Sequence, residues 1–261
     1  MRNNDTISKT LLVAILLCLF CSAIISYTAV SLKDLQEANV RLDMQKKILA
    51  SANLLDENKT VEELFGSIES KIINLDTGRY DSSINLSSFS ERAYARDVNT
   101  STVLSVDQDI ATIKRRENYQ KVYLHYQNGK ISAVILPVRG YGLWGTLYGF
   151  LALESDLKTI IGLEFYQHKE TAGLGAEVDN PRWKALWEGK KISSETGEIL
   201  ISVIKGSVDK TSPKAQYQVD GLSGATITGR GVSNLLSFWL GDLGYGPYMK
   251  EMLSKDKDAD V

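Results

Sequence analysis

The sequence predicts one membrane-spanning helix followed by a domain in which β-strands are combined with helices. Two observations lead to this fold class. Residues 11–30 contain no charged side chain, and the chain beyond Tyr119 alternates between strand-like runs and turn residues. A composition of 43% hydrophobic and 24% charged residues is ordinary for a folded protein, which excludes disorder throughout the 261 residues.

The ionisable residues argue against two kinds of binding. The 30 basic and 32 acidic residues give a formal charge of -2, and no basic block could track a phosphate backbone, so we expect no nucleic-acid partner. The chain has two histidines, His125 and His168, and two cysteines, Cys18 and Cys21. A zinc site of several such ligands could hardly be assembled, so we expect no metal.

Residues 11–30 are long enough to cross a membrane. Twenty helical residues rising ~1.5 Å each span a hydrocarbon core of ~30 Å. A cleaved signal peptide is the alternative, although its apolar region usually has only about 7–15 residues. With Arg2 and Lys9 before the span, we expect residues 1–10 to be cytoplasmic and the long part after it to be exported.

Residues 31–118 are expected to form a stalk or docking helix and a variable segment before the main domain. Residues 31–55 place apolar side chains at helical spacing among charges, which indicates a helix continuing from the membrane. Residues 57–109 are polar and rich in serine and asparagine, with a possible helix at residues 62–73 and no recognisable chemistry.

Residues 119–252 are expected to form the main folded domain. The turn residues Gln127-Asn128-Gly129 separate two strand-like runs, which is typical of a β-hairpin. Pro181 suits the first turn of a short helix that ends at Trp187. Further strands are expected at residues 146–153, 159–166 and 198–204, a helix at residues 231–240, and a frayed tail at residues 253–261.

Two glycine-rich fragments resemble well-known motifs only in part. Residues 140–145 satisfy G-x-G-x-x-G, but the segment after them reads as a strand, whereas a dinucleotide-binding turn must open a helix. Residues 220–225 narrowly miss the nucleophile elbow G-x-S-x-G, and both histidines precede the serine, contrary to the order in that fold. We therefore expect neither a Rossmann fold nor a hydrolase.

The longer stretch from Asp220 to Thr226, DGLSGAT, resembles the flavinylation motif D-x-x-S/T-G-A-T of the FMN-binding domain family. Residues 170–175, ETAGLG, are similar to the E-T-P-G-L-G signature of the same family, with Ala172 in place of proline. The residues alone also fit a small-residue turn before a helix with a serine or threonine cap. In either case, Gly224 and Ala225 leave room for a phosphate near the unpaired N–H groups of the next helix.

The resemblance implies an α+β domain with a mixed, partly antiparallel sheet and a role for each matching residue. Thr226 would carry FMN as a phosphoester, and Asp220 would belong to the motif that a flavin transferase recognises. The other implied cofactor contacts are Ser223, Gly224 and Ala225 at the turn, Glu170, Thr171 and Leu174 at the flavin ring, Trp144 beside the ring, and Lys205 as a nearby cation. No catalytic residue is implied.

The tract GYGLWGTLYGFLALE and the N-terminal anchor are similar to the C subunits of sodium-translocating NADH:quinone reductases. This resemblance implies an electron-transfer subunit in the bacterial inner membrane, with the bulk of the chain periplasmic. Its partners would be the other subunits of an NADH:ubiquinone reductase, a flavin transferase and membrane lipid. An Rnf-type subunit of a ferredoxin:NAD⁺ oxidoreductase and a membrane-anchored flavin-binding or sensory module stay open as alternatives.

Overall fold

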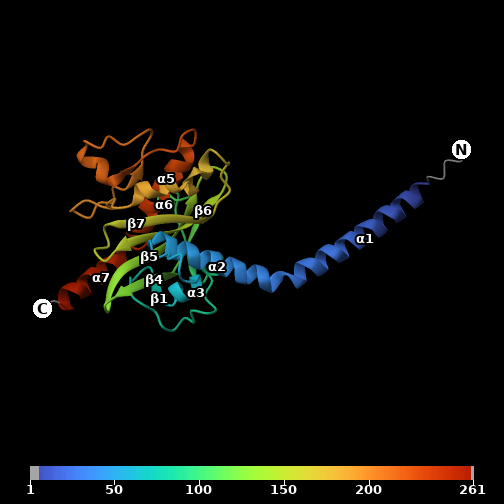
Figure 1. Ribbon diagram of the computed structural model, residues 1–261, viewed down its shortest axis with the longest axis horizontal. Coiled ribbons are helices and arrows are strands. Elements are labelled where there is room, and N and C mark those ends of the chain that lie inside the picture. Colours follow the sequence, from blue (N-terminus) through green and yellow to red (C-terminus); the bar gives the residue numbers. More distant parts are fainter. Residues whose placement is uncertain (1–5, 260–261) are drawn as a thin grey trace. The chain divides into compact units, whose positions relative to one another are not determined.

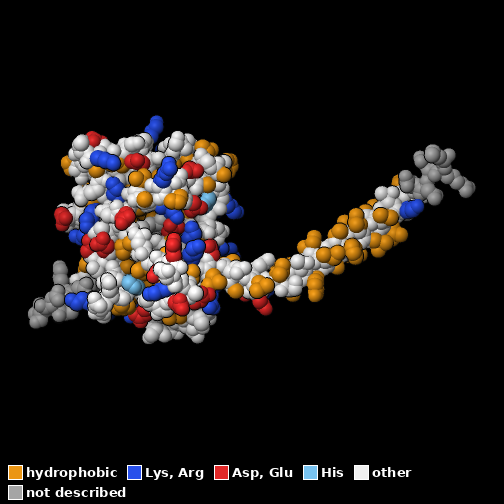
Figure 2. Space-filling model, in the orientation of Figure 1, with side chains coloured by type: hydrophobic (Ala, Val, Ile, Leu, Met, Phe, Trp, Pro, Cys, Tyr) orange, Lys and Arg blue, Asp and Glu red, His pale blue; other side chains and the backbone are white. Residues whose placement is uncertain are grey.

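The computed structural model describes residues 6–259, with side chains described as far as Lys255. The chain divides into two compact units between Met44 and Gln45. The first unit is helical. Helix α1 (Ile7–Ser31) contains the predicted span, has a mean hydropathy of 2.5 and buries no side chain within the protein. Hydrophobic side chains cover it in Figure 2, as expected for a helix that lipid surrounds.

Helix α2 (Lys33–Ser51) begins in the first unit and ends in the second. Its last turns bury Ile48 and Leu49, and Lys47 Nζ lies 3.1 Å from the Glu164 carboxylate. The predicted helix after the membrane span is therefore present, and its end packs against the folded domain. It stops at Ser51, before the predicted end at residue 55.

The second unit is built on an antiparallel sheet of five strands in the order β1-β4-β5-β6-β7 (Figure 1). The strands are β1 (Ile68–Asn74), β4 (Tyr119–Gln127), β5 (Lys130–Tyr141), β6 (Thr146–Glu154) and β7 (Ile160–Gln167). The predicted hairpin is confirmed as β4 and β5, because Asn128 and Gly129 adopt φ angles of 54° and 77° in its turn. The strands predicted at residues 146–153 and 159–166 are confirmed as β6 and β7.

Smaller elements surround this sheet. Strands β2 (Ser101–Val103) and β3 (Arg115–Glu117) pair antiparallel, while β8 (Ser202–Val203) and β9 (Gln218–Val219) pair parallel. The short helices are α3 (Val61–Phe65), α4 (Glu91–Arg96), η1 (Gly175–Asp179), α5 (Pro181–Lys184), η2 (Ala185–Trp187) and η3 (Pro213–Tyr217). The helix predicted to end at Trp187 is present as α5 and η2, and the Asn180 side chain caps it by accepting from Arg182 N. Together these elements confirm the α+β class with a mixed set of strand pairings.

The helix predicted at residues 62–73 is wrong in its second half. Helix α3 ends at Phe65, with Gly66 as its C-cap, and β1 follows and pairs along its length with β4. Strand β1 is stabilised by pairing with β4, which lies some fifty residues later in the chain. Local periodicity does not reveal such a distant partner. The compact unit therefore starts at Gln45, well before the predicted domain boundary at Tyr119.

Three further elements differ from their predicted extents. The strand predicted at residues 198–204 is reduced to the two residues of β8. Helix α6 (Thr226–Leu240) starts five residues earlier than predicted. The predicted tail belongs in part to helix α7 (Gly246–Ala259), whose Tyr248 and Met249 are buried in the core. Residues 260 and 261 of the predicted tail lie outside the described residues.

Helix α6 packs closely against β5 because glycines stand where the two elements meet. A Cβ on Gly231 would lie 2.4 Å from Tyr141 O, and one on Gly140 would lie 2.5 Å from Leu235 Cβ. Trp239 Nε1 donates to Arg139 O at 2.7 Å at the other end of the helix. These contacts fix the start of α6 beside the end of β5.

Replacing Gly231 with alanine is expected to destabilise the domain by about 1–3 kcal/mol, because the methyl group would collide with the backbone of Tyr141. In an unobstructed helix the same change gains about 1 kcal/mol. Gly229→Ala is the matched control, since its Cβ would meet only the Val203 side chain at 3.1 Å. Urea unfolding of both variants measures the difference, and equal stability of the two would contradict the close packing.

Glu91, the first residue of α4, lies near the buried Glu117 in this unit. Burial, followed by the charge of Glu117, raises the pKa of the Glu91 carboxyl from 4.5 to about 7. The folded state therefore retains a proton that the unfolded state releases, and the free energy of unfolding falls as the pH rises between these values.

Glu91→Gln is expected to stabilise the protein by about 2 kcal/mol at pH 8 and to have little effect at pH 4.5, because the amide carries no charge to bury. Thermal unfolding across this pH range gives the comparison. The exposed Glu57→Gln serves as a charge-matched control. A Glu91→Gln effect that does not change with pH would rule out the titration of Glu91 as its source.

Candidate functional site

The turn before α6 places Thr226 at the first helical position with its side chain exposed. Ala225 precedes it as the N-cap residue and provides no side-chain hydrogen bond to the helix. Gly224 has a φ of +71°, which favours glycine, and a Cβ there would lie 2.8 Å from Leu174 Cδ2. The turn therefore leaves helix N–H groups available to an anion and brings the ETAGLG loop against the SGAT turn.

A cavity of about 750 Å³ lies in front of this turn. Of the residues predicted from the sequence, it is lined by Lys205, Asp220, Ser223, Gly224 and Thr226. The parallel pairing of β8 with β9 brings these segments together. Beyond the pair, Gly221 N donates to Gly206 O at 2.7 Å, which holds the Lys205 loop beside the motif.

Asp220 ties the same loop to the motif. Its Oδ1 accepts from Val208 N at 2.8 Å, and its backbone oxygen accepts from the Trp183 indole at 2.9 Å. A carboxylate at this position therefore orders the wall of the cavity. This role is compatible with the predicted recognition by a flavin transferase, which remains a prediction.

Glu170 is buried, and both of its carboxylate oxygens are used inside the protein. Oε1 accepts from Leu143 N and Trp144 N, each at 3.0 Å, and Oε2 accepts from Thr228 Oγ1 at 2.6 Å. Gly142 makes room for it, because a Cβ there would lie 2.6 Å from Oε1. The carboxylate thus joins the loop after β5 to the first turn of α6, so it acts on the site by positioning these two segments.

Thr171 and Leu174 are exposed on a tight turn of the ETAGLG loop. Thr171 O accepts from Leu174 N and Ala176 N, each at 3.1 Å, and Gly173 has a φ of +73°. The turn forms with Ala172 in place of the usual proline. Leu174 lies beside Gly224, whereas Thr171 is not one of the residues that line the cavity.

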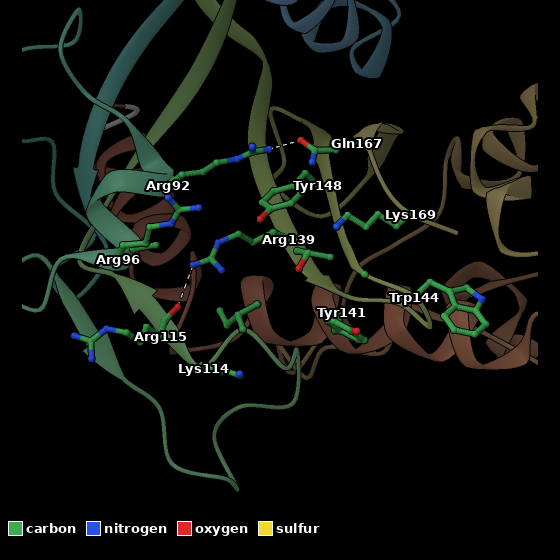
Figure 3. Close-up of a pocket in the computed structure, with 14 residues that line it drawn as sticks. Arg92, Arg96, Lys114, Arg115, Arg139, Tyr141, Trp144, Tyr148, Gln167 and Lys169 are labelled. Carbon is green, nitrogen blue, oxygen red and sulfur yellow. Dashed lines mark hydrogen bonds between the residues drawn. The ribbon is translucent and has the colours of Figure 1, made fainter. Parts of the chain in front are cut away.

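Trp144 lies in the loop that Glu170 anchors, with 63% of its surface exposed. It does not line the cavity in front of Thr226, and its indole points away from the arginines of a second cavity (Figure 3). The structure therefore brings the SGAT turn, Lys205 and Leu174 together, whereas Trp144 lies in the lining of the second cavity.

Arg230 lines the cavity in front of Thr226 and was not predicted from the sequence. It follows Thr226 by one helical turn, so a search for cations at helical spacing after the motif would have found it. Lys205 and Arg230 supply two positive charges next to an exposed hydroxyl at a helix N-terminus, a combination that fits a phosphate group. Within residues 6–255, no group of three or more histidine, cysteine or acidic side chains could hold a metal ion.

Comparison with known proteins agrees with this geometry. A family model for FMN-binding domains matches residues 142–241. The C subunit of the Na⁺-translocating NADH-quinone reductase from Pseudomonas aeruginosa is 48% identical, over 97% of this chain and 98% of that protein. The corresponding protein from Vibrio parahaemolyticus is 44% identical, over 96% of this chain and 97% of that protein.

Two solved structures share the fold. The crystal structure of Shewanella oneidensis NqrC has a TM-score of 0.76 and 37% identity, over 83% of this chain and 99% of that chain. The C subunit of the same type of reductase from Parabacteroides distasonis has a TM-score of 0.61 and 29% identity, over 84% of this chain and 96% of that chain. The chain therefore belongs to the NqrC family, the C subunits of the Na⁺-translocating NADH-quinone reductases, and contains an FMN-binding domain.

Proposed function

We propose that this chain carries FMN as a phosphoester on Thr226 and relays electrons within a membrane-bound, Na⁺-translocating NADH:ubiquinone reductase. The observation that carries the proposal is the exposed Thr226 side chain, which lines a cavity with Lys205 and Arg230 at the start of α6. The names of the relatives and the FMN-binding domain support the complex and the cofactor.

Each residue of the site has a distinct task in this proposal. Thr226 Oγ1 would hold the phosphorus, Lys205 and Arg230 would offset the phosphodiester charge, and the turn from Ser223 to Ala225 would leave room for the phosphate. Leu174, next to Gly224, would contact the ring first, and Thr171 and Trp144 would reach it only from the loops that Glu170 holds relative to α6. The bound flavin supplies one- and two-electron redox chemistry, and the protein supplies position and electrostatics.

The attachment requires a maturation step outside this chain. A flavin transferase that recognises Asp220 and the SGAT turn would use FAD as donor. The Thr226 Oγ1–phosphorus bond would form as the pyrophosphate bond of FAD breaks, AMP would leave, and the proton of the threonine hydroxyl would pass to solvent. Helix α1 anchors the chain in the inner membrane, with residues 1–10 cytoplasmic and the folded domain periplasmic. A covalent bond then keeps the cofactor on a protein that faces a compartment without flavin synthesis.

Intact-mass measurement of the full chain after coexpression with a flavin transferase tests the proposal. The expected gain is the mass of FMN minus one water. An unchanged mass would contradict covalent attachment and would favour a module that binds flavin reversibly or not at all. Restoration of NADH-dependent quinone reduction and Na⁺ uptake, in membranes that lack the native protein, tests the electron-transfer role separately.

Purification from native membranes addresses the two alternatives. Recovery with the other polypeptides of the NADH-quinone reductase is expected, because the relatives that cover nearly the whole chain carry that name. Recovery with a ferredoxin:NAD⁺ oxidoreductase instead would favour the Rnf-type assignment. Recovery without redox partners would favour the sensory module.

A further inference from the structure

A second cavity, of about 660 Å³, lies between α4, the β3 region and the ends of β5, β6 and β7. We call it the arginine cavity and define it by Arg92, Arg96, Arg139, Lys169, Tyr148 and Gln167. Its lining contains no aspartate or glutamate among the described residues, and Lys114 and Arg115 add two further cations. It shares no lining residue with the cavity in front of Thr226, but Trp144, which we place beside the flavin ring, lies on its edge, so the attachment at Thr226 accounts for Trp144 and leaves the cationic groups unexplained.

The cationic groups converge on one hollow. Figure 3 shows the guanidinium groups of Arg92, Arg96 and Arg139 directed toward the same space, with the Lys169 amine approaching from the opposite wall. The Arg115 side chain instead turns to Ser101, where its Nε donates to Oγ at 2.9 Å. Like charges that converge in this way repel one another, so their grouping carries an electrostatic cost that a bound anion would offset.

Only part of this charge is neutralised by the protein. Arg139 forms a salt bridge with the buried Glu117 and also donates to Arg115 O at 3.0 Å. Arg92 donates to the neutral Gln167 side chain and lies 4.4 Å from the centre of the Tyr148 ring. Within residues 6–255, the side chains of Arg96 and Lys169 have no hydrogen bond or salt bridge, which leaves their donors available to a ligand.

The walls of the cavity are held in place before any ligand binds. The loop before β3 places two non-glycine residues, Thr112 and Lys114, in the left-handed region, with φ angles of 55° and 65°. The Asp109 carboxylate holds this loop by accepting from Ile113 N and Lys114 N, each at 2.7 Å. Strained backbone of this kind concentrates at ligand sites, where a fixed geometry lowers the entropy cost of binding.

We propose that the arginine cavity binds a phosphate-bearing anion. Several guanidinium groups match the oxygens of a phosphate, because each offers paired donors in a fixed plane. The volume exceeds that of a bare phosphate, and the exposed Tyr141 and the Tyr148 ring provide an apolar wall for an organic portion. A soluble phosphate ester and a phospholipid head group share this chemistry, and the test separates them.

The test uses the full chain in neutral detergent micelles. Calorimetric titration with inorganic pyrophosphate is one arm, and titration with phosphatidylglycerol, against phosphatidylcholine as the neutral lipid, is the other. Saturable binding of pyrophosphate supports a soluble phosphate source, and selective binding of phosphatidylglycerol alone supports a lipid source. Absence of binding in both arms overturns the proposal.

The double variant Arg96→Gln/Lys169→Gln locates the binding. It removes two charges without breaking a hydrogen bond or salt bridge among the described residues, and we expect affinity to fall by about tenfold or more. The matched control is Lys59→Gln/Lys130→Gln, which removes two exposed charges elsewhere. Equal weakening in both double variants would show a nonspecific charge effect and would overturn the site. Unchanged binding in Thr226→Ala is expected, because Thr226 lines the other cavity.

Discussion

Replacement of Thr226 by valine is expected to abolish covalent flavin while leaving the fold intact. Valine has the shape of threonine without the hydroxyl, so it removes the only atom of this side chain that can form a phosphoester. The side chain is exposed at the first position of α6, and no other described residue makes a hydrogen bond to its hydroxyl. The loss of the hydroxyl should therefore cost little stability.

Thr228→Val is the matched control, because Thr228 lies two residues further along the same helix. Its side chain is fully buried, and its hydroxyl donates to Glu170 Oε2 at 2.6 Å. We expect this variant to retain covalent flavin even if it is less stable. In-gel flavin fluorescence after denaturation and intact mass give the readouts. Fluorescence that persists in Thr226→Val and disappears in Thr228→Val would assign the attachment to Thr228 and would contradict our proposal.

Replacement of Glu170 by alanine is expected to lower the free energy of unfolding by about 3 kcal/mol. The change removes the acceptor of the part-buried N–H groups of Leu143 and Trp144 and of the buried hydroxyl of Thr228. It also opens space beside Gly142 and Gly175, whose missing side chains accommodate the carboxylate. The loop with Trp144 should then move independently of α6.

Glu170→Gln provides the comparison that separates charge from shape. The amide oxygen can still accept from the two N–H groups, so we expect a loss of about 1 kcal/mol, from the contact with Thr228 and the weaker neutral hydrogen bonds. Urea unfolding followed by tryptophan fluorescence measures both variants. If alanine costs no more than glutamine, the three hydrogen bonds do not hold the site together. If both variants unfold normally but alter the flavin spectrum, Glu170 contacts the ring directly.

Several elements were accessible from the sequence because their signals are local. A twenty-residue run without charge predicts α1 from length alone, and the Asn-Gly turn predicts the hairpin of β4 and β5. Strand β1 and helix α7 were missed for the opposite reason. The first is stabilised by pairing with β4, and the second by burial of Tyr248 and Met249 against the core. Neither contact can be detected in a short window of sequence, because each involves residues far apart in the chain.

By itself, the sequence determined the membrane helix, the hairpin and the two motifs of an FMN-binding domain, because each is a short pattern with a local physical cause. Only the tertiary structure decided which of these residues meet. It places Glu170 against Thr228, 58 residues away, and it adds Arg230 and Lys205 to one cavity while gathering the arginines of another. Such groupings depend on strand pairing and on the approach of α6 to β5, and these are contacts between distant segments that no single stretch of sequence specifies.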